Sequence, residues 1–184
     1  MSDLEKIIKE IYELNSYSVK YKNKTKFNPI YSETYGEVTQ KSTDSIVGTF
    51  KDYFNENTVF YDLGCGLGKM VAHIGLQYNI KKSCGIELSK ERIQGAFDIK
   101  EKYCGDNVTF IQNDIFKVDI SDANVIYVDN TAMEDNVTNK IIDSLPKGCL
   151  YILRRKPFGF KGETLKNNKF ITTYKKLDIH YSIK

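Results

Sequence analysis

Residues 58–74 read TVFYDLGCGLGKMVAHI, and this stretch decides the fold. Its first part is an apolar strand that ends at the acid Asp62, and its middle is a turn that holds Gly64, Gly66 and Gly68 before a helix begins. Glycines in such a turn let the backbone approach a ligand closely, and the N-terminus of the following helix offers unpaired N–H groups. The stretch therefore predicts a strand, a ligand-binding turn and a helix in succession.

Acidic residues also follow the next two predicted strands. Glu87 lies 23 residues after Gly64 at the end of a strand, where a carboxylate can accept both hydroxyls of a ribose. Asp114 follows the strand after that and could bind an adenine amino group, with Ile115 packing on the ring. The alternative is that the glycines only turn the chain and the acids lie on solvated strand ends. Acids at three successive strand ends argue for a ligand that contains a ribose.

Three ligands compete for this turn, and its spacing separates them. A phosphate-binding Walker loop needs one more residue between Gly64 and Lys69, and Ser or Thr in place of Met70. A dinucleotide site needs glycine where Lys69 stands. S-adenosylmethionine has no phosphate and carries two cationic groups, which an acidic pocket favours. The turn, including Lys69, is therefore predicted to bind S-adenosylmethionine, with NAD as the weaker alternative.

Composition limits the classes of protein that remain. The 184 residues are 41% hydrophobic and 28% charged, which fits one globular domain with a sizeable core. Four cysteines without a CxxC pair and two histidines leave little for a metal site or a Ser-His triad, so no metal is predicted. No apolar run is typical of a signal peptide or a membrane span, so we expect an intracellular protein that contacts no membrane.

Apolar segments alternate with helix-length segments along most of the chain, which is typical of a parallel α/β sheet. Before the sheet, apolar residues at helical spacing after Ser2 and Glu5 predict a capped helix at about 3–14. The last two apolar segments flank a charged turn and predict an antiparallel pair. The predicted strands are Val59–Asp62, Ser83–Glu87, Val108–Ile111, Val125–Val128, Leu150–Leu153, 170–174 and 179–183, and a second helix is predicted at Asp44–Phe54.

Three short motifs resemble a known superfamily. DLGCGLG in the glycine turn, GIE ending at Glu87 and ND ending at Asp114 resemble the class I methyltransferases over about residues 55–184. The resemblance implies a Rossmann-like α/β fold with a seven-stranded, mostly parallel sheet, a C-terminal antiparallel pair and helices on both faces. It also implies one domain in two parts. Residues 1–54 would supply N-terminal helices, a basic connector and a loop over the cofactor, and residues 55–184 the methyltransferase core.

Further motifs resemble the disruptor-of-telomeric-silencing family of non-SET histone lysine methyltransferases. They are TYGEVT at Thr34–Thr39, VIYVDNTAM at Val125–Met133 and RKPF at Arg155–Phe158, while FKVDISDANVI at Phe116–Ile126 resembles small archaeal protein lysine methyltransferases. The resemblance implies that Tyr35, Gly36 and Glu37 form a loop over the methionine end of the cofactor, with Glu37 binding its ammonium.

The chain departs from that family at three places. About 40 residues replace a larger N-terminal helical region, the family's Asn-Asn is Asp129–Asn130, and an aromatic residue is replaced by Met133. These differences concern the substrate side of the predicted site.

Methyl transfer from a sulfonium is an in-line displacement, which requires a positioned nucleophile in a dry slot. A lysine must first lose a proton, at a cost of about 4–5 kcal/mol at pH 7, and an apolar channel reduces that cost by desolvating the ammonium. Asp129, Asn130 and Tyr127 are the candidate catalytic residues. The predicted walls of the channel are Tyr31, Tyr127, Met133 and Phe158.

Positive charge is concentrated in two segments. Residues 151–184 carry nine basic and two acidic side chains, and Lys20, Lys22, Lys24 and Lys26 alternate with other residues near the N-terminus. Such segments suit a polyanionic partner such as nucleosomal DNA or an acidic protein surface, although a solvated lysine-rich surface has the same composition. The four lysines are therefore candidate substrate-binding residues.

These observations predict an enzyme: a protein lysine N-methyltransferase that uses S-adenosylmethionine, releases S-adenosylhomocysteine and acts on a histone or another nucleic-acid-associated protein. We expect it in the nucleus if its substrate is a histone and in the cytoplasm otherwise. Two alternatives stay open. One is a small-molecule or nucleic-acid methyltransferase with the same cofactor site, and the other is a non-catalytic cofactor-binding module.

Overall fold

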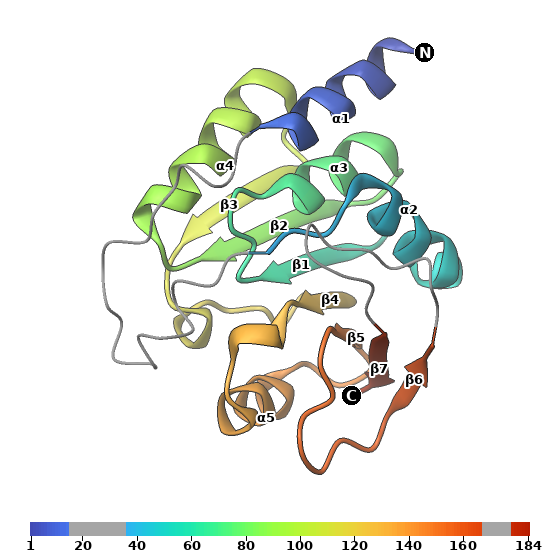
Figure 1. Cartoon of the computed structure of the whole chain (residues 1–184), viewed down its shortest axis with the longest axis vertical. Helices are drawn as coiled ribbons and strands as arrows, with labels where there is room; N and C mark the ends of the chain where they lie inside the picture. The colour runs from blue at the N-terminus through green and yellow to red at the C-terminus, as the bar shows by residue number, and fades with distance from the viewer. Residues whose placement is uncertain (15–35, 167–177) are drawn as a thin grey trace.

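The computed structural model describes residues 1–14, 36–166 and 178–184. Within them, seven strands form one sheet in the order β3-β2-β1-β4-β5-β7-β6 (Figure 1). Strands β1 to β5 run parallel, and β7 pairs antiparallel with both β5 and β6. The predicted Rossmann-like architecture is confirmed. The strands are β1 (Val59–Leu63), β2 (Lys82–Glu87), β3 (Val108–Gln112), β4 (Val125–Val128), β5 (Leu150–Leu153), β6 (Glu163–Leu165) and β7 (Ile179–Ile183).

Side chains alternate between the two faces of the sheet, and each face has its own apolar core. On β1, Phe60 belongs to one core, whereas Val59 and Tyr61 belong to the other. The prediction of helices on both faces is confirmed. Helices α2 (Gln40–Thr49), α3 (Lys69–Gln77) and α4 (Lys90–Tyr103) cover the face of Phe60, and α5 (Asp135–Ser144) covers the opposite face (Figure 1).

The N-terminal helix α1 (Asp3–Glu13) begins with the predicted capping box. The Ser2 side chain accepts from the Glu5 N–H, and the Glu5 carboxylate accepts from the Ser2 N–H at 2.6 Å. The apolar side of α1 packs on α3, where Ile11 contacts a small cluster that includes Ala72. This helix therefore covers the helical layer rather than the sheet itself (Figure 1).

Helix α2 begins earlier than the predicted Asp44, because Thr39 caps it. The Thr39 hydroxyl accepts from the Ser42 N–H at 3.3 Å, which satisfies one of the free donors of the first turn. The helix ends at Thr49, and a short 3-10 helix, η1 (Lys51–Tyr53), follows. Ile46 of α2 lies in the same core as residues of the strands, so α2 is packed into the domain core. The predicted division of the chain at residue 54 stays a prediction.

The partner of β7 in the antiparallel end of the sheet differs from the predicted one. Strand β6 lies at Glu163–Leu165 and pairs with β7, while β5 occupies the other edge of β7. The backbone approaches closely here, since a Cβ on Gly162 would lie 2.3 Å from the carbonyl oxygen of Tyr181. The glycine thus permits a short pairing of β6 with β7, and no alternation of apolar residues in the sequence predicts it. The predicted strand 170–174 lies outside the described residues.

No helix within the described residues is both long enough and apolar enough to span a membrane.

Candidate active site

The glycine turn lies between β1 and α3, and all three of its predicted glycines have left-handed backbone conformations. The φ angles of Gly64, Gly66 and Gly68 are 92°, 58° and 72°. The turn is held against β2, because the N–H groups of Gly64 and Cys65 both donate to the carbonyl of Ile86, at 2.8 and 3.0 Å. A Cβ on Gly68 would lie 2.3 Å from the Phe110 ring. Glycine is therefore required here both by conformation and by space.

Glu87 ends β2 and holds the far side of the same turn. Its side chain is 7% exposed, and its two carboxylate oxygens accept from the Gly66 N–H at 2.9 Å and the Ser89 N–H at 2.8 Å. Each carboxylate oxygen retains a lone pair for a further donor. The carboxylate is thus oriented by the protein in advance, as a group that binds ribose hydroxyls would be.

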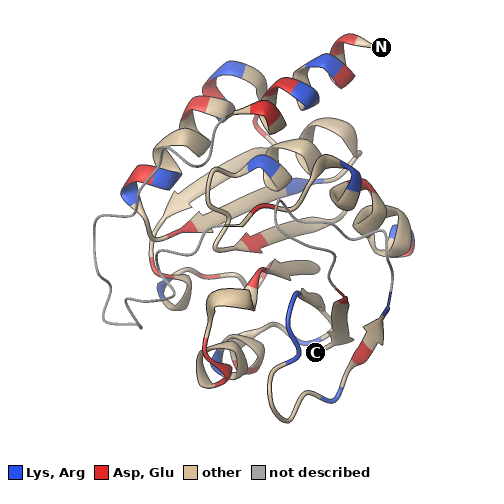
Figure 2. Cartoon of the chain, viewed as in Figure 1, with Lys and Arg blue, Asp and Glu red and all other residues tan. Residues whose placement is uncertain are grey.

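Asp62, at the end of β1, lies in an acidic environment. Burial raises the pKa of its carboxyl well above the usual range, and the nearby charges of Asp129 and Glu87 raise it further. Figure 2 shows acidic segments at the carboxyl ends of β1 and β2. A cationic ligand between these carboxylates would relieve their repulsion. These carboxylates therefore fit a ligand with a sulfonium and an ammonium, such as S-adenosylmethionine.

Asp114 lies at the carboxyl end of β3, where the short helix η2 (Ile115–Lys117) begins. It is half-buried and accepts from the Phe116 N–H at 3.0 Å, so it caps that turn. Ile115 is partly buried against the core on the α5 face. Their predicted contact with an adenine ring stays a prediction.

Lys69 and Glu37 form an ion pair above the glycine turn. The Lys69 Nζ lies 2.8 Å from a Glu37 carboxylate oxygen, and the exposed fractions of the two side chains are 4% and 11%. The same ammonium donates to the carbonyl of Leu14 at 2.7 Å, which ties the end of α1 to the turn. Glu37 was predicted to bind the cofactor's ammonium, and in this structure it pairs with Lys69. Gly36 precedes it, and Tyr35 lies outside the described residues.

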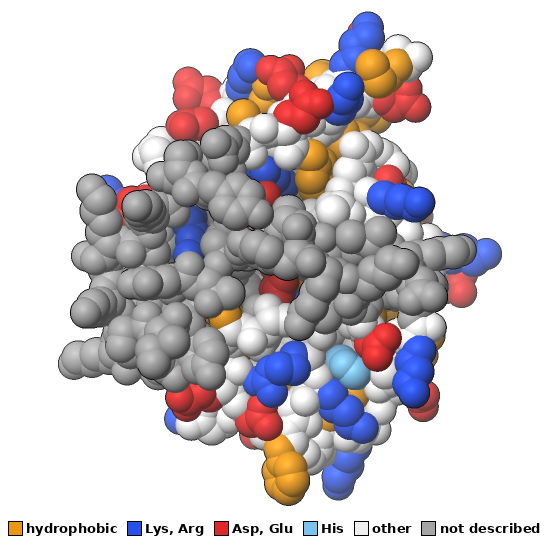
Figure 3. Space-filling model, in the orientation of Figure 1, with side chains coloured by type: hydrophobic (Ala, Val, Ile, Leu, Met, Phe, Trp, Pro, Cys, Tyr) orange, Lys and Arg blue, Asp and Glu red, His pale blue; other side chains and the backbone are white. Residues whose placement is uncertain are grey.

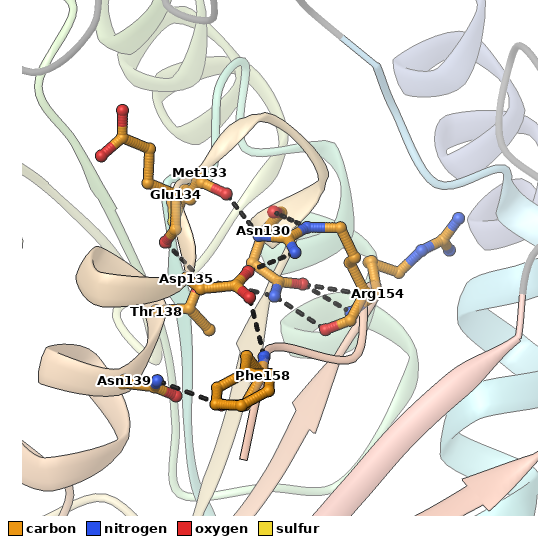
Figure 4. A network of polar contacts seen from close by, with 9 residues as sticks. Asn130, Met133, Glu134, Asp135, Thr138, Asn139, Arg154 and Phe158 are labelled. Carbon is orange, nitrogen blue, oxygen red and sulfur yellow. Dashed lines mark hydrogen bonds and ion pairs between the residues drawn. The ribbon is translucent and has the colours of Figure 1, made fainter. Parts of the chain in front are cut away.

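Asp129 and Asn130 follow β4 and have different surroundings. One Asp129 oxygen accepts from the N–H and the hydroxyl of Thr131, at 3.2 and 2.5 Å, while its charge acts on Asp62. Asn130 is fully buried: its carbonyl accepts from the N–H groups of Arg154 and Arg155 at 3.0 and 2.8 Å, and its amide donates to the Arg155 carbonyl at 2.8 Å (Figure 4). Asn130 therefore joins the ends of β4 and β5, which is a structural role.

Arg155 organises the loop that follows. Its guanidinium contacts the Asp135 carboxylate and the Met133 carbonyl, and the other Asp135 oxygen accepts from the Phe158 N–H at 2.8 Å. These contacts hold Met133 near the glycine turn, because a Cβ on Gly64 would lie 3.8 Å from the Met133 methyl. The Phe158 ring is 86% exposed, so it lies at the surface beside α5 instead of lining an enclosed slot.

Tyr127 is buried near the end of β4, on the face of the sheet that α2 and α3 cover. Burial raises the pKa of its hydroxyl, and the neighbouring Arg154 guanidinium opposes that rise. The charges of Asp129 and Asp62 also act on this hydroxyl, and Asp62 is the register partner of Tyr127 on β1. Tyr31 and the lysines Lys20, Lys22, Lys24 and Lys26 lie outside the described residues.

Sequence reasoning missed the two arginines at the end of β5 as parts of the site. Arg155 lies in the RKPF motif, but its partners come from the loop after β4, and Arg154 is 2% exposed. The one available signal was a basic pair placed directly after a buried apolar strand. Within the described residues, no group of three or more His, Cys, Asp or Glu side chains could hold a metal ion.

A family model described as "Histone methylation protein DOT1" matches residues 15–181. The chain belongs to this family. A protein-lysine N-methyltransferase from Saccharolobus islandicus is 33% identical to this chain over 73 residues, which are 39% of this chain and 45% of that relative. The matched segment thus spans less than half of the relative's length.

Solved structures give the same fold. An RNA methyltransferase from Salinibacter ruber, in complex with S-adenosyl-L-homocysteine, has a TM-score of 0.65 at 21% identity and covers 80% of this chain and 92% of its own. A SAM-dependent methyltransferase from Geobacter sulfurreducens, also with S-adenosyl-L-homocysteine, has a TM-score of 0.54 at 17% identity, with 89% and 56% covered. The predictions of the DOT1 family and of the class I methyltransferase fold are confirmed.

Proposed function

We propose that this DOT1-family chain is a protein lysine N-methyltransferase that uses S-adenosylmethionine. The observation that carries the proposal is the match of the family model to residues 15–181. The lysine acceptor is supported by the Saccharolobus relative, which is named a protein-lysine N-methyltransferase. Histones are the substrate class that the family's description suggests.

The cofactor is S-adenosylmethionine, and four parts of the chain hold it. Glu87 binds the ribose, the glycine turn lies against the methionine part, and Asp62 faces the positive charges. Asp114 and Ile115 take the adenine. When bound, the cofactor would supply a methyl group on a sulfonium, whose methyl carbon a neutral lysine amine attacks in line, with S-adenosylhomocysteine as the leaving group.

The residues after β4 form the acceptor side of the site. Met133 lies near Gly64 and Tyr127 lies beside Asp62, and their apolar surfaces exclude water from an incoming lysine. Desolvation favours the neutral amine, whereas the Asp129 carboxylate favours the ammonium. Asp129 therefore assists capture of the lysine, and the apolar walls assist its deprotonation.

The described part of the basic C-terminal segment supports an acidic partner. Lys156 and Lys161 are exposed on the loop that leads to β6, and Lys166 is exposed directly after that strand. Figure 3 shows Lys and Arg side chains gathered on this face of the molecule. We call Lys156, Lys161 and Lys166 the C-terminal basic surface. It would bind the acidic surface of a nucleosome or of another nucleic-acid-associated protein.

The proposal is tested by supplying methyl-labelled S-adenosylmethionine with nucleosomes, free histones, unrelated proteins, RNA and free metabolites in separate reactions. We expect label in protein, most strongly in nucleosomes or histones. With S-adenosylmethionine well below saturation, label should fall strongly with Glu87→Ala and stay unchanged with Glu101→Gln, an exposed acid on α4. Label confined to RNA or metabolites would contradict the lysine acceptor, and cofactor binding without any labelling would indicate a non-catalytic module.

A further inference from the structure

Arg154 is a buried arginine whose guanidinium forms no hydrogen bond or ion pair within the described residues. Its side chain is 2% exposed, and none of its three guanidinium nitrogens has a hydrogen-bond acceptor in the part of the chain that the structure describes. The residue itself is held firmly, because its N–H donates to the Asn130 side chain at 3.0 Å. An unpaired buried charge is strongly unfavourable in a folded protein. A ligand that brings an acceptor would relieve this cost.

The guanidinium lies at the same edge of the sheet as the predicted cofactor site. Leu150 and Ile152 of β5 belong to the core under α2 and α3, so the alternation of the strand places Arg154 on that face, at its carboxyl end. Figure 4 shows the side chain extending away from the contacts around Asn130. The Arg154 guanidinium therefore takes no part in the hydrogen-bond network that orders the loop after β4.

A second buried donor without a partner lies next to it. The Tyr127 hydroxyl has no hydrogen-bond partner within the described residues, although it is close enough to the guanidinium to interact with it electrostatically. The charges of Asp62 and Asp129 also act on this hydroxyl, and Asp62 is the register partner of Tyr127 on the neighbouring strand β1. Positive and negative charge thus both lie close to one buried tyrosine. This arrangement complements a ligand that carries an ammonium and a carboxylate.

We propose that Arg154 and the Tyr127 hydroxyl form a carboxylate-binding subsite beside the acid cluster. The planar guanidinium suits a carboxylate because it can donate two parallel hydrogen bonds, and the phenol adds a third donor. The carboxylate belongs either to the methionine part of the cofactor or to an acidic residue next to the target lysine. The proposal rests on the proposed function, because the site is taken to bind S-adenosylmethionine.

Calorimetry with S-adenosylmethionine and its decarboxylated analogue separates the two sources. If the cofactor supplies the carboxylate, Arg154→Met should raise the Kd for S-adenosylmethionine roughly tenfold or more and leave the Kd for the analogue unchanged. If the substrate supplies it, both Kd values should stay as in the wild type. The KM for a lysine peptide flanked by Glu should then rise, while the KM for the same peptide with Gln should not.

Two further variants guard against a folding defect. Arg154→Lys keeps the charge but not the planar fork, and Tyr127→Phe removes only the hydroxyl. Each should therefore reduce the affinity for the same ligand less than Arg154→Met does. The melting temperature of the ligand-free protein gives an independent readout. Because Arg154→Met removes an unpaired buried charge, we expect its melting temperature to rise by about 2–4 °C.

Wild-type Kd and KM values in Arg154→Met, together with a lower melting temperature, would overturn the subsite and leave Arg154 a structural role. That result differs from failure of the proposed function. In that case the wild-type protein itself would bind neither form of the cofactor, or would methylate no lysine peptide.

Discussion

At the scale of single residues, Glu87 connects the folding of the glycine turn with the binding of a ligand. Its carboxylate accepts from the N–H groups of Gly66 and Ser89, so the turn is already ordered before a ribose arrives. The remaining lone pairs are those that ribose hydroxyls would use. One buried carboxylate therefore serves both stability and binding.

Replacement of Glu87 tests this double role. Glu87→Ala should weaken the binding of S-adenosylmethionine by about 1–3 kcal/mol in calorimetry, because the ribose loses its acceptor. Glu87→Gln should have a smaller effect, since its amide oxygen still accepts from one backbone N–H. Glu101→Gln, at an exposed position of α4, is the matched control and should bind as the wild type does. Unchanged affinity in Glu87→Ala would exclude this ribose site.

Asp62 makes stability depend on pH. Its pKa in the folded protein is raised by burial and by the charges of Asp129 and Glu87, so the folded state binds this proton more tightly than the unfolded state does. The free energy of unfolding therefore falls as pH rises from the ordinary carboxyl range to the raised pKa. In Asp62→Asn this dependence should disappear.

The measurement is urea unfolding of both proteins from pH 4 upwards. The free energy of unfolding of the wild type minus that of Asp62→Asn should decrease with rising pH, because this difference cancels the other titrating groups. S-adenosylmethionine should increase the free energy of unfolding of the wild type most at high pH, since its positive charge stabilises the ionised Asp62 carboxylate. A difference that is flat or increases with pH would contradict an acidic pocket.

At the scale of elements, Gly68 joins the turn to α3. Gly68→Ala would strain a left-handed φ of 72° and push a Cβ to within 2.3 Å of Phe110. Gly148→Ala is a matched control, because its φ of 80° is equally strained but its Cβ would meet nothing within 4 Å. We expect Gly68→Ala to lose about 1–3 kcal/mol more stability than Gly148→Ala in urea unfolding. Equal losses would mean that α3 can move away from the ring.

The elements also show how far sequence reasoning extends. Strands β4, β5 and β7 have their predicted bounds, because β4 and β5 are buried apolar runs and β7 begins and ends with isoleucine around more polar residues. Strand β6 was missed, since Glu163–Leu165 is short and its pairing depends on the bare backbone of Gly162. The beginning of α2 was missed because the cap at Thr39 precedes the apolar residues.

Some contacts of the candidate site could likewise be predicted from the sequence, and others could not. Asp62 and Glu87 could be predicted to lie together, because the carboxyl ends of neighbouring parallel strands meet at one edge of the sheet. The Lys69–Glu37 pair and the position of Arg154 beside Tyr127 could not, since they join residues far apart in the chain through tertiary packing. Asn130 was predicted to be catalytic from its motif, and only its contacts with β5 indicate a structural role.

At the scale of the whole molecule, charge is divided between acids at the carboxyl edge of β1 and β2 and the C-terminal basic surface (Figure 2). Replacing Lys156, Lys161 and Lys166 with Gln should raise the KM for nucleosomes and flatten its dependence on salt, because fewer counterions are released. Activity on a short lysine peptide should survive, since the variant leaves the glycine turn intact.

The control makes the same change of charge elsewhere. Lys117, Lys140 and Lys147 are exposed on η2, on α5 and after α5, so their replacement with Gln should leave the KM for nucleosomes nearly unchanged. Equal effects of the two triple variants would mean that net charge alone, and not this surface, attracts the partner.

The central claim is that this chain transfers a methyl group from S-adenosylmethionine to a lysine amine. The most direct measurement uses S-adenosylmethionine with a deuterated methyl group and tandem mass spectrometry of the methylated protein, which identifies the acceptor atom. We predict deuterated methyl on the Nε of lysine, formed equally by the wild type and by Glu101→Gln, and more slowly by Glu87→Ala when S-adenosylmethionine is below saturation. Deuterated methyl on an oxygen, on another nitrogen or only on RNA would contradict the account.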